Sequence, residues 1–182
     1  LGVRRQEPEG GQVAPGVTVR DCAFGANLHP ATLERRRIEP LRHASARLDG
    51  HRLVFDLPGV PVFEPAFANI HPADDHVWGV LYELSTADMR RLRSYEGAAY
   101  GEVDVEVESD GARVTARAFS AEERHRPRPP SRRYLRVITE GARHHALPDP
   151  WIDRLEAQPS AYVPGLHEAW NAAFWLVEVV HR

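Results

Sequence analysis

The sequence predicts an α+β domain in which a small mixed β-barrel or strongly bent sheet is edged by α-helices. The first observation is size, because 182 residues with 42% hydrophobic side chains can supply one substantial core. The second is the predominance of extended segments, to which short helical segments are attached. The third is residues 103–118, whose alternating pattern specifies a β-hairpin together with its register.

The domain organisation follows from changes in composition along the chain. Residues 1–16 are polar and rich in glycine and proline, so we expect a flexible N-terminal tail there. Residues 17–165 are expected to form a single domain. Residues 166–182 carry Trp170, Phe174 and Trp175 and are expected to form an aromatic helical extension.

The first elements alternate between extended and helical patterns. Residues 17–24 predict a strand, and a helix is expected to begin near Pro30, a residue suited to the first helical turn. Residues 40–48 and 51–56 predict two extended segments. They flank Asp49-Gly50, a pair typical of hairpin turns because both residues tolerate positive φ.

The next segments are divided by proline and aspartate. Residues 57–65 contain several prolines and predict a loop. Residues 67–70 and 77–84 predict two buried strands. Residues 71–76 lie between them and, with a proline and two aspartates, favour a turn over a metal site.

Three further helices are predicted from their starting residues. Ser85 and Asp88 resemble a capping box at the start of a short helix over 86–93, which Gly97 is expected to stop. Ser131 is expected to cap a helix over 132–145. A last helix is expected to begin at residues 149–150 and to run through residue 158.

The hairpin over 103–118 turns at Asp110-Gly111. A two-residue turn there places Val107 opposite Val114 on one face, and it pairs Glu108 with Arg113 on the other. Asp104 and Arg117 are paired on that outer face too. These carboxylates are therefore assigned to a solvated face and not to a catalytic pair.

Composition limits the function classes. A net charge of −3 provides no general attraction to nucleic acid or anionic lipid, and no apolar run is long enough to cross a membrane. The single cysteine, Cys22, excludes a disulfide scaffold and favours a reducing, cytoplasmic setting. All 23 basic residues are arginine, which excludes lysine-based chemistry. We expect a small-molecule ligand and a monomer or homodimer.

Common catalytic motifs are missing from the sequence. It contains no G-x-S-x-G, no Walker loop, no G-x-G-x-x-G after a strand and no H-E-x-x-H, and neither a cofactor nor a metal is predicted. Cys22 lies inside a strand pattern and is interpreted as a buried thiol. The arginines at 35–37 and those between 124 and 133 are interpreted as solvated faces.

Two features are less well explained by structure alone. Residues 24–28, Phe-Gly-Ala-Asn-Leu, leave a hydrophobic strand and enter a helix, so backbone N–H groups converge where an anion or oxyanion could bind. Glu96 follows a short helix, between Tyr95 and Gly97. Taken alone, the first feature is a strand-to-helix turn and the second is a surface glutamate.

Four segments occur in an order that resembles the gamma-glutamylcyclotransferase family. They are residues 22–28, residues 77–84, Tyr95-Glu96-Gly97 with Tyr100, and residues 130–135 followed by 140–142 and 147–148. The resemblance covers about residues 17 to 157. It implies a small β-barrel edged by helices, with the loop at Gly25 and the glutamate facing each other across a pocket.

The resemblance also implies an activity. Family members release 5-oxoproline from a γ-glutamyl compound, with one glutamate moving the protons, and Glu96 occupies the matching position. The resemblance places Phe24, Gly25, Ala26, Asn27 and Leu28 at the γ-glutamyl group. Tyr100 and Tyr134 match tyrosines that line the pocket. The substrate's own α-amine is the nucleophile, so no serine, cysteine, metal or cofactor is required.

This chain departs from the family at the loop. Members typically carry Tyr-Gly-Ser-Asn, whereas Phe24 and Ala26 lack both hydroxyl groups.

Three hypotheses about the function therefore stand. The first is an enzyme that cleaves a γ-glutamyl amide of a free amino acid or amine, or that deprotects a larger γ-glutamylated metabolite. The second is a catalytically impaired module that binds a γ-glutamyl or carboxylate ligand. The third, transfer of the γ-glutamyl group to another amine, lacks a recognisable acceptor pocket.

Overall fold

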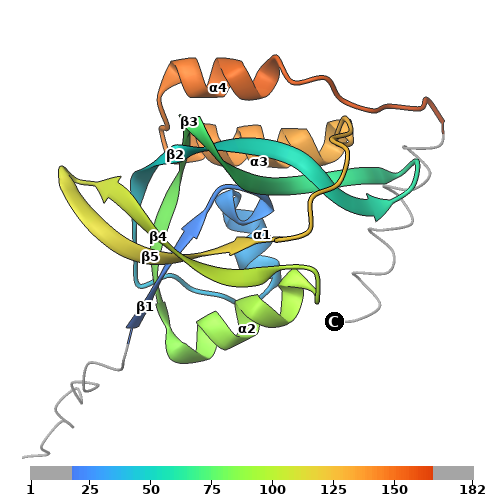
Figure 1. Cartoon of the computed structure of the whole chain (residues 1–182). Helices are drawn as coiled ribbons and strands as arrows, with labels where there is room; N and C mark the ends of the chain where they lie inside the picture. The colour runs from blue at the N-terminus through green and yellow to red at the C-terminus, as the bar shows by residue number, and fades with distance from the viewer. Residues whose placement is uncertain (1–17, 166–182) are drawn as a thin grey trace, which may run out of the picture.

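The computed structural model describes residues 18–165. The expected N-terminal tail and the expected helical extension at 166–182 lie outside the described residues. Between them the chain folds into a β-barrel with helices packed around it, as Figure 1 shows. The predicted fold class is confirmed.

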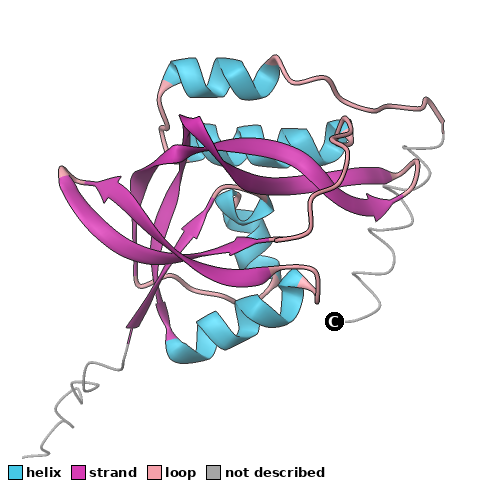
Figure 2. Ribbon diagram, viewed as in Figure 1, coloured by secondary structure: helices cyan, strands magenta, loops and turns pink. Residues whose placement is uncertain are grey.

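Five strands form a closed barrel in the order β1-β3-β2-β4-β5 (Figure 2). Their bounds are β1 Thr18–Ala23, β2 Arg42–Val60, β3 Glu64–Ser85, β4 Gly101–Ser109 and β5 Ala112–Ser120. Neighbours pair antiparallel except β1 and β5, which close the barrel in parallel through Asp21 and Arg117. Closure leaves no free edge between the first and last strands.

The helices lie on two sides of the barrel. Their bounds are η1 Ala26–Leu28, a 3₁₀ turn, then α1 Pro30–Arg35, α2 Thr86–Glu96, α3 Arg132–His144 and α4 Asp149–Glu156. In Figure 1, α3 and α4 lie on one side and α2 on the opposite side. The predicted starts are confirmed: Ser85 and Ser131 accept first-turn N–H groups of α2 and α3, and Pro30 opens α1.

The central part of the sheet corrects three expectations. Asp49-Gly50 does not turn a hairpin, because β2 continues through it as one long strand and the pairing with β3 only shifts register there. Gly50, at φ 71°, makes a bulge opposite residues 73–75. Residues 71–76 therefore continue β3 and are not a turn, and most of the expected loop at 57–65 is strand.

β2 continues through Asp49-Gly50 because its partner strand, β3, is long enough to pair with it on both sides. Asp-Gly favours a turn locally, but β3 offers pairing on both sides of Gly50, and a bulge keeps both halves of the ladder. The actual β2–β3 hairpin turns at residues 61–63, where Val62 has φ 74°. By contrast, the β4–β5 hairpin matches its prediction in full, including the pairs Val107 with Val114 and Asp104 with Arg117.

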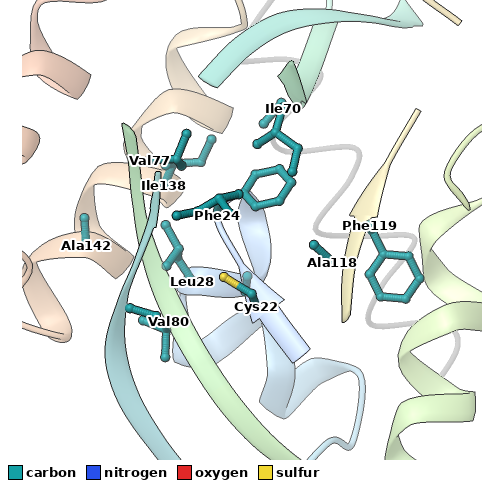
Figure 3. Packing of buried hydrophobic residues seen from close by; sticks show 14 of the residues in the cluster. Cys22, Phe24, Leu28, Ile70, Val77, Val80, Ala118, Phe119, Ile138 and Ala142 are labelled. Atoms are coloured by element: carbon teal, nitrogen blue, oxygen red, sulfur yellow. The ribbon is translucent and has the colours of Figure 1, made fainter. Parts of the chain in front are cut away.

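The hydrophobic core fills the barrel and extends under α3. Figure 3 shows Phe24, Leu28 and Cys22 meeting side chains from β3 and α3. Leu28 and Ile138 are fully buried, so η1 is held between the barrel and α3. Burial of such side chains contributes about 1.5–3 kcal/mol each. The packing therefore fixes the strand-to-helix turn on which the candidate site is built.

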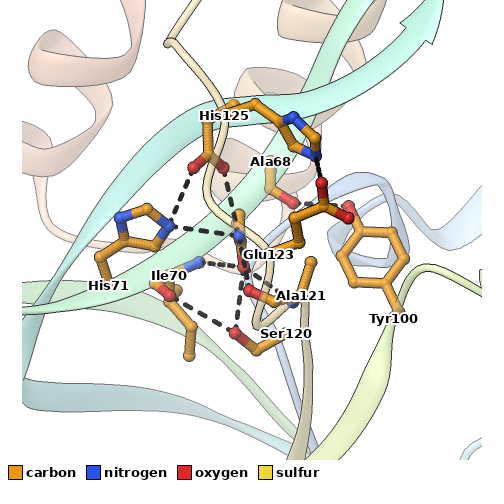
Figure 4. A network of polar contacts seen from close by, with 10 residues as sticks. Ala68, Ile70, His71, Tyr100, Ser120, Ala121, Glu123 and His125 are labelled. Atoms are coloured by element: carbon orange, nitrogen blue, oxygen red, sulfur yellow. Dashed lines mark hydrogen bonds and ion pairs between the residues drawn. The ribbon is translucent and has the colours of Figure 1, made fainter.

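A buried polar network joins β3 to the end of β5 (Figure 4). The Asn69 amide bonds the Asp56 carboxylate at 3.1 Å, and its oxygen accepts the Ala121 N–H at 3.1 Å. His71 Nε2 lies 2.9 Å from an oxygen of Asp56. Tyr100 donates to the Ala68 carbonyl at 2.6 Å. Through these contacts the network links β2, β3 and the end of β5 beside the cavity, which Ala68 lines.

Candidate active site

A cavity of about 1410 Å³ opens between the strand-to-helix turn, the end of α2 and the outer face of β5. It is lined by residues from far apart in the sequence, including Gly25, Asn27, Glu96, Tyr100 and Tyr134. The loop and the glutamate singled out by sequence therefore share one cavity. Glu96 is the last residue of α2, not a residue beyond it, and Gly97 ends the helix at φ 72°.

The strand-to-helix turn is compact. The Leu28 N–H donates to the Gly25 carbonyl at 3.0 Å, so that amide closes the 3₁₀ turn. Leu28 is buried beneath the turn and is not among the cavity-lining residues, whereas Phe24, Gly25, Ala26 and Asn27 are. The Gly25 and Asn27 N–H groups donate to no acceptor within residues 18–165. These two amides are the donors that a bound anion or oxyanion could use.

Glu96 is held by two partners at one oxygen. Its Oε1 accepts from Asn27 Nδ2 at 2.9 Å and from Arg36 Nη1 at 2.8 Å. Arg36 Nη1 also donates to Asn27 Oδ1 at 2.6 Å, which completes a triangle. The side chains of Arg36 and Glu96 are only 20% and 13% exposed. Oε2 receives no recorded donor from the described residues, so one carboxylate oxygen is available to a ligand.

Tyr100 and Tyr134 line the cavity, and both hydroxyl groups bond to the backbone of Ala68. The Ala68 N–H donates to the Tyr134 hydroxyl at 3.2 Å, and Tyr100 donates to the carbonyl of the same residue. Burial raises the pKa of both phenols above the usual value, so they are neutral hydrogen-bonding groups at physiological pH. A Cβ on Gly25 would lie 3.2 Å from the Tyr134 hydroxyl, so glycine suits this close approach.

Two residues of the cavity escaped the sequence analysis. Arg36 belongs to the arginine cluster interpreted as a solvated face, and that interpretation is wrong for Arg36, which is turned inward onto Glu96. Asp21 lies in the cavity wall and is 1% exposed. Its position offered a signal, because an aspartate inside a hydrophobic strand pattern next to Cys22 is unusual.

Neither Cys22 nor His145 has a pKa that favours a reactive role at this cavity. Cys22 is buried, and burial raises the pKa of its thiol to about 12, which opposes a nucleophilic role. Burial lowers the pKa of His145 to about 4, and its ring contacts the Tyr82 hydroxyl at 3.0 Å. Across residues 18–165 no cluster of three metal-ligating side chains is found. In that same part of the chain no helix is long and apolar enough to span a membrane.

Comparisons with known proteins find relatives by sequence and by fold. The AIG2-like family matches residues 76–155, a segment that includes Glu96, Tyr100 and Tyr134. Gamma-glutamyl cyclotransferase gliK of Aspergillus fumigatus is 30% identical, over 87% of this chain and 66% of its own length. The gliK protein of Claviceps purpurea is 32% identical, over 70% of this chain and 64% of its own length. The chain thus spans slightly less than two thirds of these fungal relatives.

Other relatives are matched over more of their length. The gamma-glutamylcyclotransferase of Bos taurus is 27% identical, over 77% of this chain and 79% of its own length. A solved structure of a gamma-glutamyl cyclotransferase superposes with a TM-score of 0.73 at 24% identity, covering 82% of this chain and 92% of the other. The structural likeness concerns the fold. The ordered motifs, the family match over residues 76–155 and the curated relatives together identify the chain as a member of the AIG2-like, gamma-glutamylcyclotransferase family.

Proposed function

We propose that the protein cleaves a γ-glutamyl amide by intramolecular cyclisation, releasing 5-oxoproline and a free amine. The observation that carries this proposal is the 2.9 Å hydrogen bond between Asn27 and Glu96, which lie 69 residues apart in sequence. This contact places the turn expected to hold the γ-glutamyl group beside the residue expected to move protons. The names of the relatives support the same reaction class.

The reaction requires bond exchange at one carbon atom. The α-nitrogen of the substrate attacks its own γ-carbonyl carbon, a five-membered ring closes, and the original amide C–N bond breaks. The α-ammonium group loses two protons to become the lactam N–H, and the leaving nitrogen gains two protons to become an ammonium. No external nucleophile is needed, because the attacking amine is already tethered to the carbonyl.

Glu96 is proposed as the group that moves these protons. Asn27 and Arg36 bind Oε1 of this cavity-lining residue, and Oε2 is proposed as the proton acceptor and donor. The N–H groups of Gly25 and Asn27 are proposed to stabilise the oxyanion of the tetrahedral intermediate. Tyr100 and Tyr134 are proposed to line the γ-glutamyl pocket, and Phe24 and Ala26 to contribute packing and backbone without hydroxyl groups.

A binding module remains the second candidate function. The observation that favours it is the composition of the turn, because Phe24 and Ala26 both line the cavity and neither carries a hydroxyl. If those hydroxyls are needed for turnover elsewhere in the family, this chain would hold a γ-glutamyl or carboxylate ligand without converting it. Retention of Glu96 at the cavity favours the enzyme.

The experiment is a 5-oxoproline release assay with mass spectrometry, on a panel of γ-glutamyl amino acids, γ-glutamyl amines and glutathione. The wild-type protein is compared with Glu96→Gln and with Glu106→Gln, a matched change at an exposed residue of β4. We expect Glu96→Gln to lower kcat by about 10²-fold or more, the range for loss of a general acid–base, and Glu106→Gln to leave it unchanged.

The outcomes separate the two functions. Product from Glu96→Gln at the wild-type rate refutes the proposed role of Glu96. Binding of a γ-glutamyl compound by the wild-type protein without any product supports the binding module.

A further inference from the structure

Asp21 is a buried acid that no other described residue satisfies. It lies in the middle of β1 and in the wall of the cavity, and it is 1% exposed. Both carboxyl oxygens are buried, and neither has a hydrogen-bond partner among residues 18–165. An unpaired buried polar group of this kind is costly, so its presence in a cavity wall calls for a ligand.

The cations around Asp21 are already engaged. Arg117 is its register partner on β5, but Arg117 Nη1 donates to Glu102 of β4 at 2.7 Å. Arg36 is bound to Glu96 at the end of α2. On β3, Tyr82 faces Asp21 in register, and the Tyr82 hydroxyl donates to the Asn27 carbonyl at 3.2 Å. Arg36 and Arg117 are thus each bound to a glutamate, and within residues 18–165 no arginine donates a hydrogen bond to the Asp21 carboxyl group.

Asp21 is distinct from the other acidic residues of the cavity. Glu34 is exposed, and Glu96 already accepts two donors. Burial, with smaller repulsion from Glu96 and Glu102, raises the pKa of Asp21 to about 8. This direction favours the neutral, protonated form of Asp21 at pH 7, and a nearby positive charge would favour its ionisation.

We propose that Asp21 binds the α-ammonium group of the ligand, as a second acidic residue of the same cavity. This inference rests on the proposed function, since every γ-glutamyl compound carries an ammonium group at its α-carbon. The ammonium donates one N–H to Asp21, which holds the nitrogen in position, and a second faces Glu96, which removes its proton. Asp21 thereby positions the nucleophile and selects ligands that carry the ammonium.

Binding has a proton balance that can be measured. Neutral Asp21 releases its proton to solvent when the ammonium arrives, and a charge-assisted N–H···O⁻ hydrogen bond replaces the O–H. Because the pKa of Asp21 is raised above 7, we expect ligand binding at pH 7 to release protons. A ligand of the same chain length without the ammonium releases none through Asp21.

Isothermal titration calorimetry tests this with L-glutamate and glutarate, which differ only in the amino group. The protein is used as wild type, Asp21→Asn, and Asp104→Asn, a matched change at an exposed residue of β4. We expect Asp21→Asn to weaken L-glutamate binding about tenfold or more, as for loss of a charge-assisted hydrogen bond, and to leave glutarate binding unchanged. The titration is repeated in buffers that differ in ionisation enthalpy. The dependence of the measured binding enthalpy on the buffer gives the number of protons released.

The results distinguish failure of this inference from failure of the proposed function. Equal effects on both ligands, no effect on either, or no L-glutamate binding by the folded wild-type protein would overturn the role of Asp21. Asp21-dependent L-glutamate binding without turnover of any γ-glutamyl compound would retain the inference and reject the enzyme. If the protein turns over a γ-glutamyl compound, Asp21→Asn is expected to raise KM more than it lowers kcat, because Asp21 binds the substrate's ammonium group. A merely structural role of Asp21 would affect L-glutamate and glutarate binding alike.

Discussion

Replacement of Asp21 by asparagine should change how the stability of the protein depends on pH. The carboxyl group is fully buried, and its pKa rises from 3.8 to about 8 mainly through burial. Between these values the unfolded chain has lost the proton and the folded protein retains it. The proton on Asp21 therefore adds to the free energy of unfolding. This contribution is fully present below pH 3.8 and is lost as the pH rises toward 8.

The magnitude follows from the number of protons bound. With one more proton on the folded state, the free energy of unfolding falls by about 1.4 kcal/mol per pH unit through this range. Between pH 5 and pH 7 the wild-type protein should lose about 3 kcal/mol relative to Asp21→Asn, which cannot titrate. Only the difference between the two slopes is compared, so any constant effect of the amide cancels.

The assay is urea denaturation at pH 5, 6 and 7, followed by far-ultraviolet circular dichroism. Asp104→Asn, on the exposed face of β4, serves as the control and should run parallel to the wild type. If Asp21→Asn also runs parallel to the wild type, then Asp21 does not carry a proton in the folded protein at these pH values. Such a result would refute a neutral Asp21 in the cavity wall.

Two further substitutions test how α3 supports the site. Gly141→Ala would place a Cβ 2.6 Å from the backbone carbonyl carbon of Leu28. We expect the free energy of unfolding, measured by urea denaturation, to fall by about 1–3 kcal/mol. Because the turn shifts, the rate of 5-oxoproline release should fall too. Ser131→Ala removes the cap of α3 and a hydrogen bond to buried Glu64, and should cost about 2 kcal/mol by the same denaturation assay. Ser85→Ala removes the cap of α2 and a hydrogen bond to Asp88, whose side chain is 16% exposed against 6% for Glu64, and should cost less, about 1 kcal/mol. An equal loss in both serine variants would contradict a larger contribution from the more deeply buried Glu64.

Local chemistry made the second half of the fold predictable. The Asp110-Gly111 turn and the alternation on both sides of it determine the β4–β5 register, because a two-residue turn leaves one way to pair the flanking valines. The helix starts at Ser85 and Ser131 were predictable for the same reason, since a serine oxygen satisfies first-turn N–H groups a few residues away. Each of these features depends on neighbours in the sequence.

The first half of the fold was misjudged where distant pairing prevailed. Asp49-Gly50 has the composition of a hairpin turn, yet the long partner strand β3 pairs on both sides of it, and the glycine forms a bulge. The turn propensity of a few residues carries no information about a partner strand that lies twenty or more residues away in the sequence. The same limit explains why residues 71–76 were expected to turn.

By itself, the sequence determined the α+β class, the caps, one hairpin with its register and, through ordered motifs, the family and the candidate residues Asn27 and Glu96. Only the tertiary structure decided that Arg36 turns inward to hold Glu96 and that Asp21 lies unpaired in the cavity wall. The physical reason is that a side chain's charge partner and its access to water depend on residues brought together by barrel closure. A strand or helix pattern specifies its own backbone, whereas the electrostatic environment of a site is set by the whole fold.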